Sequence, residues 1–423
     1  MKWILGYAAG AVLLLAPVCL RVLLRSEAAP LPLEEAAVRE GKMLFTHEWT
    51  VNDSLSATGD GLGPVFNATS CAQCHFQGGL GGSGRQEHNV TTFFRPGNRR
   101  GKTEQGVIHA HAISQDYQEN LTHASPDLPP LVQPTLEQIR KSEEHAAQVR
   151  CRNSPIEISQ RNTPALFGAK LIDEMPDQVI LANERFQKLR WRDPSGQGES
   201  VPVGRALRLR DGRIGKFGWK AQSPDLLAFV QAACANELGL GNPGQAQPVP
   251  LAQTSYRPRG LDLTTEQCEQ MAAFIAALPR PVEKAPNDAR GQERVTRGRQ
   301  LFNEVGCADC HVPNMGSVEG VYSDFLVHRM GTDLVGGGSY FSPPPDSSPS
   351  PSADPLPDEW RTPPLWGVAD SAPYLHDGRA ATLADAIQMH GGQAQATAGR
   401  FRNLRPGQQE DLLRFLKSLR APG

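Results

Sequence analysis

Apolar positions follow two different patterns along the chain. Near its start, residues 3–20 form an uninterrupted apolar run behind Lys2. Further on, apolar residues recur every three to four positions in two stretches, which is the spacing of one buried helix face. This spacing predicts one amphipathic helix past the middle of the chain and another at its end. Their apolar positions are Cys268, Met271, Phe274, Ile275 and Leu278, and Leu412, Phe415, Leu416 and Leu419.

The apolar run at the start predicts an export segment. A positive charge followed by an apolar core is typical of a secretory signal. The run is also about as long as a bilayer-spanning helix, so residues 1–29 are predicted to be either a cleaved signal peptide or a single membrane anchor. Both alternatives place the rest of the chain in the periplasm, and the second tethers it to the inner membrane.

The rest of the chain repeats one plan twice. Each copy has a G-x-x-L-F string, then C-x-x-C-H, then T-P-x-L-aromatic-G behind an arginine, and ends in one of the two amphipathic helices. The same features in the same order indicate a duplicated domain. We predict domains at 30–280 and 289–423, with a large insertion at about 76–160 in the first. The strings begin at Gly41, Cys71 and Thr163 (behind Arg161), and at Gly298, Cys307 and Thr362 (behind Arg361).

The composition indicates that much of the chain forms loops. The 423 residues include 41 Gly and 35 Pro, which is high for a bundle of long helices. Residues 342–358 are a Pro/Ser-rich loop, and 280–288 look like the inter-domain linker. We therefore predict a mainly α fold of short helices and long loops. The net charge of -2 argues against a nucleic-acid-binding protein, which needs a clustered basic surface.

Four of the eight cysteines lie in the two C-x-x-C-H motifs, the attachment signature of c-type haem. Two thiols at this spacing can add to haem vinyl groups, and the histidine can then ligate the iron. Zinc would require two further ligands for each pair, but the other cysteines are isolated. A thioredoxin-type pair would not explain the histidine. The motifs predict two covalently bound haems c, held by Cys71, Cys74 and His75 and by Cys307, Cys310 and His311.

Three further cysteines follow the export segment. Cys234 and Cys268 could form a disulfide in an oxidising compartment or remain two buried free thiols. Cys151 has no obvious partner.

Four segments resemble the di-haem oxidoreductase family, whose members are described as thiol oxidoreductases or peroxidases. This family is related to bacterial di-haem cytochrome c peroxidases and to MauG. The resemblance implies two cytochrome c-like domains whose haems face a shared interface. The segments cover residues 61–75, 161–177, 217–239 and 361–392.

The resemblance also implies catalytic residues. Trp219 is similar to the tryptophan between the two haems of the peroxidases. An ungapped alignment of residues 217–231 with 374–388 places Trp219 opposite His376. Glu237 resembles the distal-pocket glutamate, which would move a proton between the two oxygens of a peroxide. Trp219 and Glu237 are therefore the predicted catalytic residues.

His390 occupies the position of the second haem's sixth ligand, where peroxidases have methionine and MauG has tyrosine. His390 would give bis-histidine ligation and a lower potential than His/Met ligation, and Met330 is the alternative ligand. Gly168 replaces the asparagine that binds calcium in the peroxidases, so the resemblance does not extend to that calcium site. For the sixth ligand of the first haem, any one of the four histidines of the insertion could serve, or none of them: His88, His109, His111 and His123.

The expected function is an exported di-haem oxidoreductase of cytochrome c peroxidase type. The haem at His75 would react with a small-molecule oxidant, and the haem at His311 would relay electrons from a small redox protein or a quinol-linked donor. One alternative is an electron-transfer cytochrome with both irons six-coordinate. The other is an oxidase of thiols or protein side chains.

Overall fold

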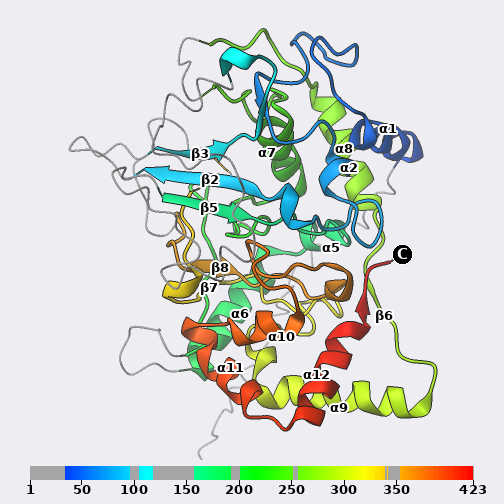
Figure 1. Ribbon diagram of the computed structural model, residues 1–423, viewed down its shortest axis with the longest axis vertical. Coiled ribbons are helices and arrows are strands. Elements are labelled where there is room, and N and C mark those ends of the chain that lie inside the picture. Colours follow the sequence, from blue (N-terminus) through cyan, green and yellow to red (C-terminus); the bar gives the residue numbers. More distant parts are fainter. Residues whose placement is uncertain are drawn as a thin grey trace, which may run out of the picture. The chain divides into compact units, whose positions relative to one another are not determined.

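In the computed structural model, each repeat is built around a pair of packed helices. Helix α1 (Glu35–Thr46) packs on α8 (Thr265–Ala277), and α9 (Ala289–Val305) packs on α12 (Pro406–Ser418) (Figure 1). The glycine of each G-x-x-L-F string lies where the two backbones meet. A Cβ on Gly41 would lie 1.8 Å from the carbonyl oxygen of Gln270, and one on Gly298 would lie 2.0 Å from that of Asp411. Glycine is therefore required at both positions by close backbone approach.

The structure describes residues 34–95, 104–117, 157–191, 201–250, 256–338, 341 and 353–422. The predicted export segment (1–29), His123 and Cys151 lie outside these ranges. Among the described residues, none of the helices is both long enough and apolar enough to span a bilayer.

The two amphipathic helices are confirmed. Helix α8 begins with a capping box between Thr264 and Gln267 and ends two residues before Pro279. Helix α12 has a proline in its first turn. Their buried apolar residues are among those that the spacing predicts: Cys268, Met271, Phe274 and Ile275 in α8, and Leu412, Phe415 and Leu416 in α12.

The prediction of a mainly α fold holds only in part, because the insertion contains strands. Strand β2 (Val90–Arg95) lies between β3 (Glu104–Ile108) and β5 (Glu157–Arg161) in an antiparallel sheet (Figure 1). The neighbours Thr92 and Phe93 are both buried, so β2 lacks the two-residue alternation that identifies a strand in sequence.

Short ladders and helices complete the described parts. Two-residue strands β1 (Val65–Phe66) and β4 (His111–Ala112) pair, as do β7 (Val327–Arg329) and β8 (Glu359–Arg361). The predicted linker is also paired, since β6 (Val282–Glu283) bonds to β9 (Leu419–Arg420). The other α-helices are α2 (Cys71–Cys74), α5 (Ala169–Asp173), α6 (Asp177–Arg190), α7 (Leu226–Leu238), α10 (Leu383–Gln388) and α11 (Gln395–Arg402).

The described residues form two large apolar cores and two small clusters, one of Phe93 and Ile108 and the other of Leu207, Ala221 and Val327. The larger core contains Phe45 and Phe274 of the first repeat, but also Phe325, Leu326 and Trp366 of the second. The smaller core is built from the second repeat alone, around the aromatic rings of Phe302, Tyr322 and Phe415. The domain boundaries at 30–280 and 289–423 remain a prediction, because the larger core uses side chains from both ranges.

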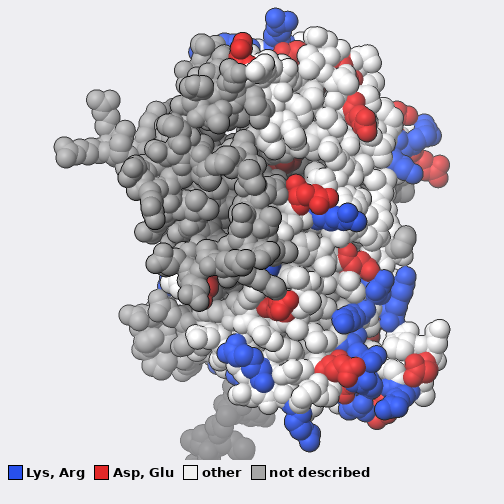
Figure 2. Space-filling model, viewed as in Figure 1, with Lys and Arg blue, Asp and Glu red and all other residues white. Residues whose placement is uncertain are grey.

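Charged side chains of both signs are interspersed on the face shown in Figure 2. Over α9 and α12, Arg294 bonds to Glu410 and Asp411, and Arg297 bonds to Glu293 and Asp411. The pairs with Glu410 and Asp411 connect α9 to α12, whereas the pair of Arg297 with Glu293 lies within α9.

The alignment that places Trp219 opposite His376 is matched by the backbone. An isolated β-bridge joins Phe217 to Ser223, and another joins Tyr374 to Ala380 at the aligned positions. The aligned residues Asp225 and Thr382 then cap α7 and α10 with their side chains. The two repeats therefore share this turn and the helix that follows it.

Candidate functional site

The first C-x-x-C-H motif lies on the wall of a cavity. Its cysteines form the single turn of α2, and the backbone N–H of His75 donates to the carbonyl of Cys71 at 3.0 Å. Both thiols and His75 line the cavity, together with Glu237 and Trp219. The structure thus brings the first predicted haem-attachment residues together with both predicted catalytic residues.

The second motif lies on the wall of a larger cavity. Cys307 begins a 3₁₀ turn, η2 (Cys307–Asp309), and the N–H of His311 donates to the carbonyl of Cys307 at 2.9 Å. Cys307, Cys310 and His311 all line this cavity. So do both candidates for the sixth ligand, His390 and Met330.

Three histidines of these cavities share one hydrogen-bond pattern. The Nδ1 atom of each lies beside a backbone carbonyl: Gly82 at 3.0 Å from His75, Tyr322 at 3.0 Å from His311 and Ala386 at 2.7 Å from His390. Nδ1 must therefore carry the proton, which leaves Nε2 with a free lone pair. A metal-binding imidazole is held in this way by a carbonyl behind it.

Burial keeps these rings neutral. It lowers the pKa of His75 to about 4, and it lowers that of His311 to about 4 with a contribution from nearby His390. Burial also lowers the pKa of His390. Because a protonated ring cannot ligate iron, these shifts favour the ligand form at neutral pH.

The motif thiols are also neutral. Burial raises the pKa of Cys71, Cys74 and Cys307 to about 12 and raises that of Cys310. A thioredoxin-type pair needs a lowered thiol pKa, so these sites do not suit that chemistry. Two neutral thiols and a neutral imidazole on the wall of a mainly apolar cavity fit a haem.

The remaining described cysteines do not form the disulfide that the sequence allowed. Cys234 and Cys268 are buried free thiols, and the Sγ atom of Cys234 lies 4.0 Å from the Sδ atom of Met271. The free-thiol alternative therefore holds in this structure.

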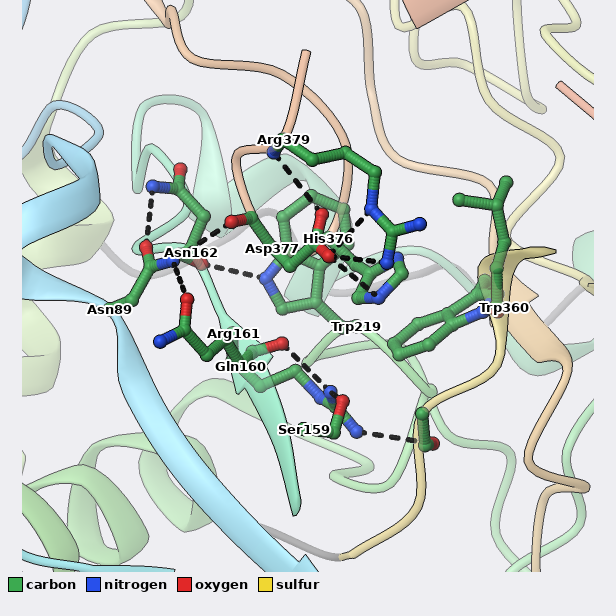
Figure 3. Close-up of polar contacts among 12 residues, drawn as sticks. Asn89, Ser159, Gln160, Arg161, Asn162, Trp219, Trp360, His376, Asp377 and Arg379 are labelled. Atoms are coloured by element: carbon green, nitrogen blue, oxygen red, sulfur yellow. Dashed lines mark hydrogen bonds and ion pairs between the residues drawn. The ribbon is translucent and has the colours of Figure 1, made fainter. Parts of the chain in front are cut away.

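Trp219 lines both cavities. Its indole Nε1–H donates to the carbonyl of Asn162 at 2.7 Å (Figure 3). The two repeats also exchange backbone bonds at this point. Asn162 N–H donates to the carbonyl of His376 at 2.6 Å, and Arg361 N–H donates to that of Trp219 at 2.9 Å. Each repeat thus fixes the turn that carries Trp219 or His376 in the other.

Glu237 lies near the end of α7 and is fixed from the opposite loop. The side-chain amide of Asn67 donates to its Oε2 at 2.8 Å, and the backbone N–H of Asn67 donates to its carbonyl at 2.7 Å. The carboxylate is close enough to Cys71 and Cys74 to contribute to their raised pKa. A base is therefore held beside the first motif.

The histidines of the insertion are now distinguishable. His88 lines the first cavity. His109 is buried, and its Nε2 lies 2.9 Å from the carbonyl of Asn236. His111 is exposed at the β1–β4 ladder. Among the described histidines of the insertion, His88 alone lines the first cavity.

The structure places further residues at the cavities for which the sequence predicted no such position. His376 lines the second cavity and stacks on Trp360, with ring centroids 3.7 Å apart (Figure 3). Arg161 and Lys220 lie against the same indole, 4.6 and 4.0 Å from its ring centroid. The arginine before each T-P-x-L string was a sequence signal, but the sequence did not show that Arg161 lines the first cavity and Arg361 the second.

Within the described ranges, one cluster has three side chains of metal-ligand type: Cys310, Asp324 and His328. Both ring nitrogens of His328 are already engaged, at 2.8 Å from Asp324 Oδ2 and 2.9 Å from Gln393 Oε1. His328 therefore has no free lone pair for a metal, and the cluster serves as a hydrogen-bond network in the wall of the second cavity.

Several known proteins are similar to this chain. Hydrazine synthase subunit gamma of Kuenenia stuttgartiensis is 28% identical over 190 residues, which are 38% of this chain and 51% of that subunit. The chain thus spans about half the length of this relative. A solved hydrazine synthase structure from Kuenenia stuttgartiensis has 18% identity and a TM-score of 0.42, covering 92% of this chain and 88% of that one.

Two further solved structures are similar at low identity. The diheme peroxidase BthA of Burkholderia thailandensis has 15% identity and a TM-score of 0.39, covering 93% of this chain and 87% of its own. A MauG-like protein associated with microbial copper homeostasis has 16% identity and a TM-score of 0.30, covering 58% of this chain and 90% of its own.

A family match covers more of the sequence. The family described as "Di-haem oxidoreductase, putative peroxidase" matches residues 132–419, which is more than half of the chain. The protein therefore belongs to the di-haem oxidoreductase family, which implies haem as its cofactor.

Proposed function

We propose that the protein is an exported di-haem c-type oxidoreductase that reduces a peroxide in its first cavity. The haem of that cavity is attached to Cys71 and Cys74 and ligated by His75. The haem of the second cavity is attached to Cys307 and Cys310 and ligated by His311. The observation that carries the proposal is the position of Trp219, whose indole lines both cavities.

The haems supply the redox chemistry when they are bound. Trp219 lines both cavities, so its indole would give electrons a short aromatic route between the two haems. Its indole is fixed by Asn162 and by the backbone bond from Arg361. This fixed position makes Trp219 the bridging residue of the proposal.

Glu237 handles protons in the first cavity. Reduction of hydrogen peroxide to two waters consumes two electrons and two protons. The Glu237 carboxylate accepts a proton from one peroxide oxygen and returns it to the other, which becomes the leaving water. Asn67 orients the carboxylate for this transfer.

The test is peroxide turnover by the wild-type protein and two variants. We expect Glu237→Gln to lower kcat/KM for peroxide about 100-fold or more, the usual loss for a general acid–base residue. Trp219→Phe should slow electron transfer from the reduced second haem without loss of haem. Trp49→Phe is the matched control, because Trp49 is buried but lines neither cavity. Wild-type protein that carries two haems but consumes no peroxide would refute the proposal.

A second candidate function is electron transfer without peroxide chemistry. His88 on the wall of the first cavity favours it, because a histidine there could occupy the sixth position of the iron. Electron paramagnetic resonance separates the two candidates. A high-spin signal in the oxidised or half-reduced protein supports the peroxidase. Two low-spin signals in the fully oxidised protein, one of which His88→Ala replaces with a high-spin signal, support the cytochrome.

The electron donor that we propose is a small redox protein or a quinol-linked carrier in the periplasm. The proposal rests on the apolar run at residues 3–20, which would export the chain or tether it to the inner membrane. Fractionation of cells expressing the full chain, with haem staining of each fraction, tests the location.

A further inference from the structure

Besides Lys216, which pairs with Asp177 at 3.2 Å, three buried lysine or arginine side chains line the walls of the two cavities. Arg161 is 7% exposed, Lys220 4% and Arg361 8%. Arg161 and Lys220 line the first cavity, and Arg361 lines the second. Burying a charge in a protein is costly unless an opposite charge accompanies it.

The partners of these cations are neutral. The ammonium of Lys220 donates to the carbonyls of Leu356, Pro357 and Glu359 at 2.8 to 2.9 Å. Arg161 donates to the Ser159 hydroxyl and to the carbonyls of Gln160, Gly336 and Gly337. Arg361 donates to the carbonyls of Gly218 and Thr362.

The neighbouring carboxylates form their ion pairs and hydrogen bonds with other residues. Asp377 is bonded to Arg379, with Nε 2.7 Å from Oδ2 (Figure 3), and Glu359 is held by two nitrogens of Arg205 at 2.6 and 2.7 Å. Asp324 accepts from Gln187 at 2.8 Å and lies 2.8 Å from His328. Among the described residues, no carboxylate lies within ion-pair distance of Arg161, Lys220 or Arg361.

The lowered pKa values of the three side chains show that their burial disfavours the charged form. Arg161 and Lys220 lie against the same indole, that of Trp360. Burial and the charge of Arg161 lower the pKa of Lys220 well below its ordinary value. Burial likewise lowers the pKa of both arginines. The three charges therefore need anions that the described chain does not supply.

We propose that these cations bind haem propionates. Arg161 and Lys220 pair with the propionate carboxylates of the haem at His75, and Arg361 pairs with those of the haem at His311. Each haem carries two propionates, which supply the missing negative charge inside the cavities. This inference rests on the proposed haem sites and adds the residues that hold the anionic edge of each haem.

The test uses the haem-loaded full chain and the variants Arg361→Gln, Lys220→Gln and Arg161→Gln. Loss of a cation beside a haem should lower the reduction potential of that haem and shift its propionate bending band in resonance Raman spectra. We expect Arg361→Gln to affect the haem at His311, and the other two variants to affect the haem at His75. Arg361→Lys, which keeps the charge, should retain most of the potential.

Arg208→Gln is the matched control, because Arg208 pairs with Glu184 and lines neither cavity. If the test variants carry both haems and change the reduction potential and the propionate bending band no more than the control does, the inference is wrong. If the wild-type chain carries no covalently bound haem, the proposed function fails instead.

A measurement on the wild-type protein tests the inference even if the variants do not fold. An ion-paired propionate keeps its charge on acidification, so its bending band should stay constant from pH of about 7 to about 4, which is near the usual carboxyl pKa. A band that titrates near the usual carboxyl pKa would overturn the inference without any variant.

Discussion

His390 is the residue whose identity most affects the second haem. Its ring is buried, its Nδ1 is held 2.7 Å from the carbonyl of Ala386, and it lines the cavity of His311. We predict that His390→Met raises the reduction potential of this haem and changes its low-spin signal in electron paramagnetic resonance, because methionine favours the ferrous state more than histidine does.

The competing ligand supplies the control for that variant. Met330 lines the same cavity, so Met330→Leu should leave the low-spin signal of the second haem unchanged if His390 is the ligand. The reverse result, in which Met330→Leu alters the signal and His390→Met has no effect, would identify Met330 as the sixth ligand of the second haem.

At the residue scale, a sequence can predict a site whose residues are close together in the chain. The two thiols and the histidine of C-x-x-C-H lie within five positions, so the motif predicts haem attachment without knowledge of the fold. Arg161, Lys220 and Trp360 gave no such signal, because their relation depends on packing between segments far apart in the chain. The same holds for the bond from Asn162 to His376, which joins the two repeats.

At the element scale, we predict that Gly298→Ala destabilises the protein. A Cβ at this position would lie 2.0 Å from the carbonyl oxygen of Asp411, so α9 and α12 would have to move apart. Overpacking of this kind costs about 1–3 kcal/mol in the free energy of unfolding. Chemical denaturation monitored by circular dichroism would measure the loss.

Gly399 in α11 is the matched control. The nearest atom to a Cβ there is a nitrogen of the Arg402 guanidinium, 3.7 Å away, so Gly399→Ala meets open space. It should stabilise the protein by roughly 0.5–1 kcal/mol, the ordinary gain for alanine over glycine in a helix. Equal destabilisation by both variants would show that close helix packing is not the cause.

Helix α6 carries a buried carboxylate that makes stability depend on pH. Glu184 is 2% exposed and bonds to Arg208 at 2.7 Å and to Lys188 at 3.0 Å. Burial alone would raise its pKa, but these two cations outweigh burial and lower it. A lowered folded-state pKa gives stability that is present above the unfolded pKa of about 4.3 and is lost as the pH falls through the folded value.

We therefore predict that Glu184→Gln costs about 1–2 kcal/mol in unfolding free energy at pH of about 7, a range kept low because Arg208 and Lys188 are half-exposed. The difference from wild type should shrink as the pH falls below about 4. Glu174→Gln, which removes a more exposed pair with Lys170, should cost only a few tenths of a kcal/mol. Urea denaturation at both pH values measures each difference, and a difference independent of pH would contradict the role given to charge.

Elements were predictable to the extent that their own residues determine them. Helices α8 and α12 have clear apolar faces, so spacing located both. The strands of the insertion were missed because Val90–Arg95 acquires its burial pattern from β3 and β5, which both follow it in the chain. The paired linker was missed for the same reason, since β6 depends on a strand more than a hundred residues later.

At the scale of the whole molecule, the two repeats share an apolar core and are joined by backbone hydrogen bonds. Phe325, Leu326 and Trp366 of the second repeat belong to the larger core, which is otherwise built mainly from the first. The β6–β9 ladder ties the linker to the chain's end, and the backbone bonds at Trp219 and His376 run in both directions. The repetition visible in sequence therefore does not imply two independently stable halves.

We predict that residues 289–423 alone do not form a stable domain, even with haem attached. Cutting the chain there would expose the side chains that the second repeat contributes to the larger core and leave β9 without its partner. Exposed apolar surface of this kind removes the free energy that burial provides, at about 25 cal/mol for each Å². Calorimetry should therefore show one cooperative transition for residues 34–423 and none for the fragment. A fragment that unfolds cooperatively near the temperature of the longer chain would instead establish two autonomous domains, and the shared core would then be only an interface between them.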